Sequence, residues 1–366
     1  MALVLARLIA PHMTQRISLA EAWQRRRNNF NLIRLFAAWL VIWSHAWPIT
    51  GTPGSDPFGQ FTGRTAGALA VDVFFVISGF LVAASLQRNR VVPFLLARGL
   101  RIYPALLACV ALTVLVLGPL LTTDPAYWRD PETWRYLWSN ATLWRAEYFL
   151  PGVFDTLPRT AANGSLWTLP IEIRLYLALL VAGVLGMLVP RRYLPAWGLA
   201  IAGACAFAWT QRPLPEHLEY LTWVTAFFIT GTLLWVLREK VVLSAWWLLP
   251  MVAVAVLARG TPWFVPAYFA TVVHGTFCLA FLPQLPVIER TDLSYGLYLY
   301  GWPMQQVAVL LGAASVVSNT LAASLLAVAC AGLSWFLVER PALRLKRRWV
   351  PRRKATPAIP VEEVPT

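Results

Sequence analysis

The chain has 366 residues, of which 58% are hydrophobic and 13% are charged, and its mean hydropathy is +0.59. Soluble proteins carry about 25% charged residues, so this composition excludes a soluble globular protein and predicts an all-α polytopic membrane protein. The formal net charge of +14 does not indicate nucleic-acid binding, because the basic residues concentrate in alternate loops, the pattern that orients a chain in a membrane. Membrane lipids and small anions are the expected partners.

Ten apolar segments are long enough to span a bilayer. They cover about 29–49, 66–86, 102–121, 165–189, 194–210, 220–237, 241–259, 264–285, 294–312 and 316–338. An even number of spans with basic residues at both ends predicts a bundle of about ten helices with both termini in the cytoplasm. We therefore expect a cytoplasmic segment at 1–27, a membrane domain at 28–340 and a basic, disordered cytoplasmic tail at 341–366.

The first segment contains two ionisable residues, Arg34 and His45. Their spacing is about three helical turns, so both side chains share a face and lie about 16 Å apart along the axis. Ionisable groups at membrane depth usually face a bundle interior, a water-filled path or a reacting site. This segment is therefore expected to contribute to a functional site.

The second segment carries Asp72 near its outer end, on one stripe with Phe75 and Gly79. A glycine there allows the backbone of a neighbouring helix to approach closely. The carboxylate should lie near a cation, and His45 is at a similar predicted depth. A functional carboxylate and a structural ion pair both explain Asp72.

The third segment begins with Arg98 and Arg101, which share a helix face. Two guanidinium groups on one face suit the oxygens of a phosphate. The alternative is ordinary basic charge that sets the membrane orientation.

The long outer loop at 122–164 combines acidic residues with many aromatic ones. Trp138, Trp144, Tyr148 and Phe149 suit the membrane interface or the lining of an acceptor cleft, and the sequence leaves both open.

The fourth segment opens with a polar stripe made by Ser165, Thr168, Glu172 and Tyr176. Pro170 frees a backbone carbonyl inside this segment, which is tolerated where a bundle or a cavity offers another partner. Glu172 is the candidate site carboxylate, and a structural partner is the alternative.

The segment at 294–312 places Tyr295, Tyr298, Trp302 and Gln306 on one face, directly after Ser294. Such an aromatic stripe is typical of helix packing and equally of a pocket wall.

Several motifs are missing from the sequence. No His, Cys, Asp or Glu cluster has metal-ligand spacing, and there is no phosphate-binding P-loop, dinucleotide glycine motif or G-x-S-x-G element. These absences argue against a metal site, ATP-driven transport, nicotinamide chemistry and a serine hydrolase.

Taken together, the motifs resemble the acyltransferase family 3 membrane proteins, which include O-acetyltransferases of bacterial surface polysaccharides. The matching elements are the arginine–ten-residue–histidine motif at Arg34 and His45, the VD-x-FF-x-x-SGF block around Asp72 and Ser78, the R-x-x-R of Arg98 and Arg101, the SLW-[ST]-L-x-x-E block at 165–172 and the SYG-LYL block at 294–299. They follow the family's order from residue 28 to about 340. Gly301 stands where many relatives have a histidine, so a mechanism that needs that histidine is not available here.

The resemblance implies a donor and an acceptor. The donor would be cytoplasmic acyl-CoA, with acetyl as the acyl group that the family favours and with no permanently bound cofactor. Arg98 and Arg101 would lie near its phosphates, and Arg34 would continue this anion path or orient the thioester. The acceptor would be a hydroxyl of an extracytoplasmic or lipid-linked glycan. The location would be the bacterial inner membrane.

The predicted depths of the ionisable residues suggest their roles in such a reaction. His45 would be the general base, oriented by Asp72 or Glu172, and Ser78 or a backbone amide near Pro170 would stabilise the oxyanion. A covalent acyl-histidine is an open alternative. The substrate pocket would contain Ser78, Trp167, Ser294, Tyr295, Tyr298 and Trp302.

Two other classes of protein remain possible from the sequence. A transporter or flippase of a small anionic or lipid-linked substrate would use Arg34, Asp72 and Glu172 as a pathway, and consumption of an acyl-CoA thioester separates it from an enzyme. A scaffold would use the buried charges only for packing, and loss of folding on His45→Ala would favour it.

Overall fold

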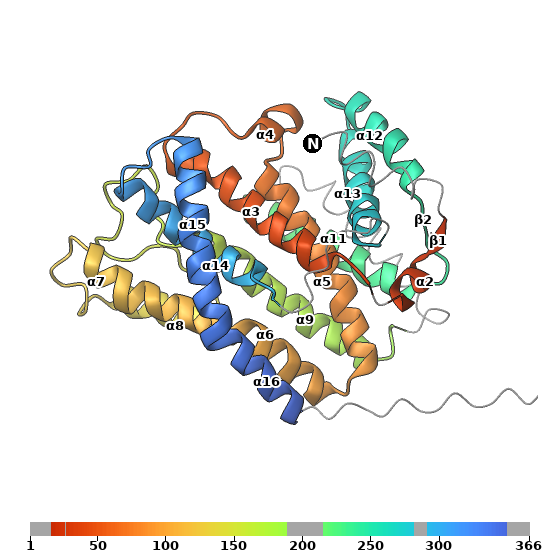
Figure 1. Ribbon diagram of the computed structural model, residues 1–366, viewed down its shortest axis with the longest axis horizontal. Coiled ribbons are helices and arrows are strands. Elements are labelled where there is room, and N and C mark those ends of the chain that lie inside the picture. Colours follow the sequence, from red (N-terminus) through yellow and green to blue (C-terminus); the bar gives the residue numbers. More distant parts are fainter. Residues whose placement is uncertain (1–15, 26, 189–214, 282–290, 350–366) are drawn as a thin grey trace, which may run out of the picture.

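The computed structural model describes residues 16–25, 27–188, 215–281 and 291–349 (Figure 1). Within these ranges, seven helical stretches are long and apolar enough to cross a membrane. They are Phe30–Ile49, Ala66–Arg88, Val91–Leu121, Gly164–Val184, Leu218–Val236, Phe264–Phe281 and Val316–Leu345. The protein is therefore an all-α polytopic membrane protein, as predicted from its composition.

The long helices have the following bounds: α3 Phe30–Ile49, α5 Ala66–Arg88, α6 Val91–Leu112, α9 Thr168–Val184, α11 Glu216–Val236, α13 Phe264–Phe281, α14 Ser294–Leu310 and α15 Val316–Ser334. Short elements connect them: α2 Leu19–Gln24, α4 Pro57–Thr62, α7 Gly118–Leu121, α8 Pro131–Thr142, α12 Leu248–Leu257 and α16 Arg340–Trp349. The 3₁₀ helices Gly164–Trp167 and Ala245–Trp247 precede α9 and α12, and π-helical turns at Thr113–Leu117 and Trp335–Glu339 follow α6 and α15. A two-residue antiparallel ribbon pairs β1 Ile17–Ser18 with β2 Val242–Leu243.

One predicted span is not a single helix. The segment at 241–259 begins with β2 and a 3₁₀ turn, and only the ten residues of α12 are α-helical. Ten residues rise about 15 Å, half of a typical hydrocarbon core. The chain turns at Gly260, whose φ of 78° ends the helix. The predicted span at 194–210 lies outside the described residues.

Helix α5 packs against α3, α9, α11 and α13. Its approach to α11 is unusually close, because a methyl group on Gly79 would overlap the carbonyl oxygen of Phe228, and one on Gly231 would overlap the carbonyl oxygen of Val76. The close approach expected at Gly79 is thus confirmed, with a reciprocal glycine on α11.

Helix α14 has 17 residues and is buried along most of its length against α3, α6 and α15 (Figure 1). Side-chain bonds attach it to the loop before α9. Asn163 donates to the carbonyl of Leu299 at 2.9 Å, and Gln306 donates to the carbonyl of Ala161 at 3.0 Å. These bonds fix the start of α9 beside the middle of α14.

Candidate active site

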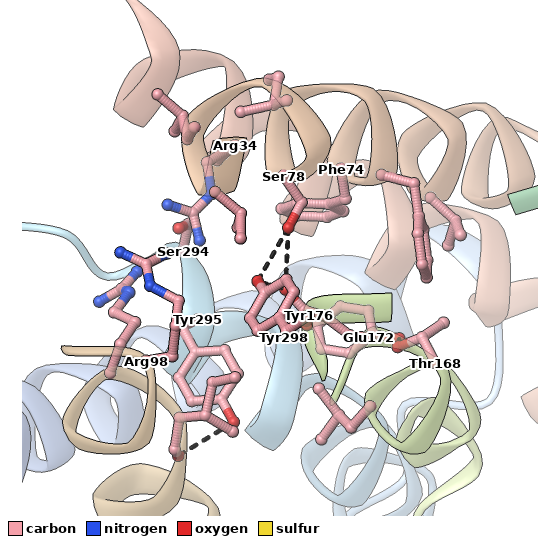
Figure 2. Close-up of a pocket in the computed structure, with 18 residues that line it drawn as sticks. Arg34, Phe74, Ser78, Arg98, Thr168, Glu172, Tyr176, Ser294, Tyr295 and Tyr298 are labelled. Carbon is pink, nitrogen blue, oxygen red and sulfur yellow. Dashed lines mark hydrogen bonds between the residues drawn. The ribbon is translucent and has the colours of Figure 1, made fainter. Parts of the chain in front are cut away.

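A pocket of about 810 Å³, including its opening to solvent, lies between α3, α5, α6, α9 and α14. Figure 2 shows Arg34 and Arg98 at one side of it and Thr168 at the other. Its polar lining consists of Arg34, Ser78, Arg98, Arg101, Thr168, Glu172, Tyr176, Ser294, Tyr295 and Tyr298. Residues from all five sequence motifs therefore meet in one cavity.

A carboxylate holds two of the three arginines. Asp292, just before α14, accepts from Arg101 at 2.5 Å and from Arg34 at 3.4 Å. Burial would raise the pKa of Asp292, but the two guanidinium groups and the hydroxyl and backbone N–H of Ser294 lower it to about 2. Glu339 lies 3.8 Å from Arg101 on its other side. Arg34, Arg101, Asp292 and Glu339 therefore form one charge-paired corner of the pocket.

Arg98 differs from its two neighbours. It lines the same pocket, and its buried Nε has no hydrogen-bond partner. No ion pair to Arg98 is present in the described ranges of the chain. A buried guanidinium without a counter-ion is costly, so this group is suited to an anionic ligand.

Glu172 lies at the centre of the pocket with two hydroxyl groups. Ser78 Oγ donates to Glu172 Oε1 at 3.2 Å and lies 2.8 Å from the hydroxyl of Tyr176, which also donates to Glu172 (Figure 2). Ser78 comes from α5 and the other two residues from α9, one turn apart. Three polar groups from two helices thus form one hydrogen-bonded cluster inside an apolar wall.

Tyr298 closes the far side of the pocket. Its hydroxyl donates to the carbonyl of Ser165 at 2.7 Å and lies 2.7 Å from Thr168 Oγ1. Tyr295, one turn earlier on α14, donates to the carbonyl of Ile102 at 3.1 Å, and Arg101 lies 5.7 Å from its ring centre. The aromatic stripe on α14 is therefore a pocket wall over these two residues and also a packing surface.

His45 does not line the pocket. Its ring packs edge-on against Trp302, with 4.8 Å between ring centres, and its buried Nδ1 has no hydrogen-bond partner. Trp302 is one helical turn beyond Tyr298 on the same face of α14, and its Nε1 donates to the carbonyl of Ala161 at 2.9 Å. His45 is thus separated from the pocket by about one turn of α14.

The expected contact between Asp72 and His45 is not formed. Asp72 is 1% exposed and accepts from Trp223 at 2.8 Å, from Tyr268 at 2.9 Å and from Arg64 at 3.3 Å. A full positive charge and two neutral donors satisfy the carboxylate, so no lone pair is directed to the histidine. Glu172 is likewise bonded to Ser78 and Tyr176.

Trp167 also lies outside the pocket lining, where its ring contacts Tyr220 at 5.6 Å. The outer-loop aromatics Trp138, Trp144 and Phe149 are exposed by 64%, 78% and 60%. None of the three lines the pocket, so their exposure favours the interfacial alternative.

Two partners were not identified from the sequence. Asp292 stands two residues before Ser294, a position typical of a helix cap, and this was the available signal. Arg64 is the only basic residue between positions 50 and 87, eight residues before Asp72. In both cases the sequence drew attention to the residue itself. It could not identify the partner, which lies on another element.

Comparison with known proteins identifies one family model and several relatives that cover most of the chain. The family model described as an acyltransferase domain matches residues 27–339. The chain is 30% identical to "Nodulation protein 10" of Rhizobium leguminosarum bv. viciae, over 89% of this chain and 96% of that protein. It is 29% identical to an "O-acetyl transferase" of Shigella phage Sf6, over 86% and 96%. It is 28% identical to the "Putative membrane-bound transacylase BcsY" of Komagataeibacter xylinus, over 89% and 85%.

No solved structure matched the chain. The family match covers most of the sequence, and every motif of the site lies within it. This multi-pass membrane protein therefore belongs to the acyltransferase family 3 and is an O-acyltransferase.

Proposed function

We propose that the protein transfers an acyl group, most simply acetyl, from cytoplasmic acyl-CoA to a hydroxyl of a cell-envelope carbohydrate. The observation that carries the proposal is the pocket, where a positive corner of three arginines continues into a cluster of hydroxyl groups around Glu172. An anionic donor with a polar reacting group at its far end matches both parts.

The donor's phosphates would lie at the arginine corner. Among the residues that the structure describes, no carboxylate forms an ion pair with Arg98, whereas Arg34 and Arg101 share Asp292. Charge-assisted bonds between guanidinium and phosphate oxygens are short and strong. Arg98 would therefore make the principal new bond when the donor binds, and Arg34 and Arg101 would add to the positive field.

The transfer step needs a base and an oxyanion donor. His45 would accept the proton of the acceptor hydroxyl as its oxygen attacks the thioester carbonyl. Ser78 would turn its O–H from Glu172 to the carbonyl oxygen and stabilise the negative charge that develops there. The intermediate would then collapse, breaking the carbon–sulfur bond, and the CoA thiolate would take up a proton.

The two substrates would approach from opposite sides. Arg34 and His45 are about three helical turns apart on α3. His45 does not line the pocket but contacts Trp302, one turn beyond Tyr298 on α14. The acceptor would thus be extracytoplasmic or lipid-linked, in the inner membrane of a bacterium. Asp72, held by Arg64, would keep the acceptor side of α5 in place as a positioning residue.

The experiment that tests this proposal uses purified protein in liposomes with acetyl-CoA and an envelope glycan fraction. The readouts are free CoA and base-labile esters on the glycan. We expect both products with the wild type. His45→Ala should lower kcat by roughly 10²–10⁴-fold, the usual contribution of general-base catalysis, while CoA binding is retained.

The same assay separates the alternatives. Acetyl-CoA left intact by a well-folded wild type, with any glycan, would contradict the enzyme reaction and favour a transporter. Ester formation at the wild-type rate by His45→Ala would remove His45 from the chemistry. Loss of both folding and CoA binding in His45→Ala would favour a packing role for the buried histidine.

A further inference from the structure

A second cavity, of about 600 Å³ including its opening, lies between α11, α13 and the β1–β2 ribbon. The wall is almost entirely apolar and includes Leu19, Leu234, Leu243, Phe269, Val273 and Phe277. The ring of His274 in this wall already has a partner, since its Nε2 lies 2.9 Å from the carbonyl oxygen of Ser244. The cavity therefore suits a hydrocarbon chain.

The cavity reaches the surface of the molecule at one residue of its wall. Ala270, which lines it, is exposed and lies in the middle of α13, a helix of membrane-spanning length. An opening at that depth faces the hydrocarbon region of a bilayer. A lipid chain can enter there without crossing water.

Two arginines lie beside the cavity, and no carboxylate among the described residues pairs with either of them. The guanidinium of Arg238 is 4.3 Å from the ring centre of Trp235, and that of Arg88 is 5.8 Å from the same ring and 5.0 Å from that of Trp23. Neither arginine forms an ion pair within the part of the chain that the structure describes. One N–H of Arg238 donates to the carbonyl of Trp235 at 2.9 Å. The remaining N–H groups of the two guanidinium groups, gathered on one indole, make a site for a phosphate.

The arginines and the cavity share the same chain segments. Trp235 directly follows Leu234 of the cavity wall, and the carbonyl of Arg238 accepts from the backbone N–H of Ala20 at 2.9 Å. The neighbouring Leu19, also in the wall, donates from its backbone to Val241 at 2.8 Å. In Figure 1, α2, β1 and β2 lie together beside α11 and α13. An anion on the arginines is therefore close to the chain in the cavity.

From these observations we propose that the cavity binds one acyl chain of an anionic phospholipid, whose phosphate lies on Arg88 and Arg238. Apolar burial stabilises the chain, and basic pockets between spanning helices are suited to acidic headgroups. The proposal does not depend on the acyl-transfer reaction, because neither arginine lines the first pocket.

The test uses the full-length protein in detergent, with phosphatidylglycerol and phosphatidylcholine of identical acyl chains as probes. Native mass spectrometry measures retained lipid, and thermal unfolding measures stabilisation. We expect phosphatidylglycerol to bind at least tenfold more tightly. The double variant Arg88→Gln, Arg238→Gln should remove this preference. The control Arg340→Gln, Arg344→Gln removes the same charge from α16 and should preserve it.

A second pair of variants tests the cavity itself. Ala270→Phe should fill the opening and weaken both lipids at least tenfold, whereas Ala329→Phe, on the exposed face of α15, should weaken neither. If Ala270→Phe does not fold, the smaller Ala270→Leu replaces it. Equal binding of the two lipids, unchanged binding to Ala270→Phe, or full stabilisation by inorganic phosphate alone would each overturn the proposal.

Discussion

In the proposed reaction, recognition of the donor depends most directly on Arg98. It is the arginine of the pocket that has no carboxylate partner among the described residues. A hydrogen bond to a charged group contributes about 1.5–3 kcal/mol, which corresponds to roughly 10- to 100-fold in affinity. We therefore expect Arg98→Gln to raise the KM for acetyl-CoA by about that factor with little change in kcat, measured from initial rates of CoA release.

The matched control for Arg98 is Arg135→Gln. Arg135 is exposed on α8, where it pairs with Glu132 and Glu147, so the KM should not change. A lower kcat at unchanged KM in Arg98→Gln would show that Arg98 acts on the transition state and not on donor binding.

Asp292 gives a second prediction at this scale, in the acid range. Its folded-state pKa of about 2 is below the ordinary value near 3.9. The carboxylate therefore stabilises the fold fully above pH 4, by on the order of 2 kcal/mol. This contribution is lost as the pH falls from about 4 to 2.

The measurement is thermal unfolding of the wild type and Asp292→Asn in detergent across this range. We expect Asp292→Asn to be less stable at pH 6 and the difference to close by pH 2. A difference that stays constant over the whole range would contradict the ionised pair.

The residues themselves were largely predictable, but their partners were not. Arg34, Arg98, Arg101, Ser78 and Glu172 all line one pocket, as the motifs implied. Helical periodicity places residues on a face within about one turn. It says nothing about Asp292, which is 258 residues from Arg34 in the chain and 191 from Arg101.

The same limit explains Asp72. Its need for a cation could be inferred from its depth, and the cation is Arg64. Two donors from distant helices, Trp223 and Tyr268, complete the site and leave His45 with Trp302. The catalytic roles of Asp72, Glu172 and His45 remain predictions.

Among the elements, the packing of α5 against α11 gives a testable prediction about stability. Each places a glycine against the other's backbone, Gly79 against Phe228 and Gly231 against Val76. Adding a methyl group forces the helices apart, and overpacking of this kind costs about 1–3 kcal/mol. We expect Gly79→Ala and Gly231→Ala each to lower the unfolding midpoint in detergent.

Gly332→Ala serves as the control, because a methyl group on Gly332 of α15 meets open space. It should leave stability unchanged or raise it slightly, since alanine favours a helix. Equal effects of all three variants would mean that helix propensity, and not the close approach of α5 and α11, determines the outcome.

Segment hydropathy predicted most of the helices because membrane spans are defined by length and apolarity. It failed at 241–259, where the apolar composition continues through a ribbon and a 3₁₀ turn. The pairing of Ile17 with Leu243 is a long-range contact, and a hydropathy window cannot register it.

For the whole molecule, we predict which loops lie on which side of the membrane. The connections at Arg88–Arg90 and Arg238–Lys240 are basic, whereas the loop at 122–164 contains five acidic residues. The positive-inside bias predicts that the first two are cytoplasmic and the third is outside. The donor corner would then be on the same side as the basic connections, as the proposed reaction requires.

Cysteine labelling in intact cells tests this arrangement, after the four native cysteines are replaced by serine. We expect Arg129→Cys and Gln60→Cys to react with a membrane-impermeant maleimide, and Asn89→Cys and Glu239→Cys to react only after permeabilisation. The reverse pattern would place the arginine corner outside the cell, where acyl-CoA is not supplied. Donor and acceptor would then have to exchange sides. The transmembrane transfer that we proposed from the separation of Arg98 and His45 would fail, even if the chemistry at His45 were correct.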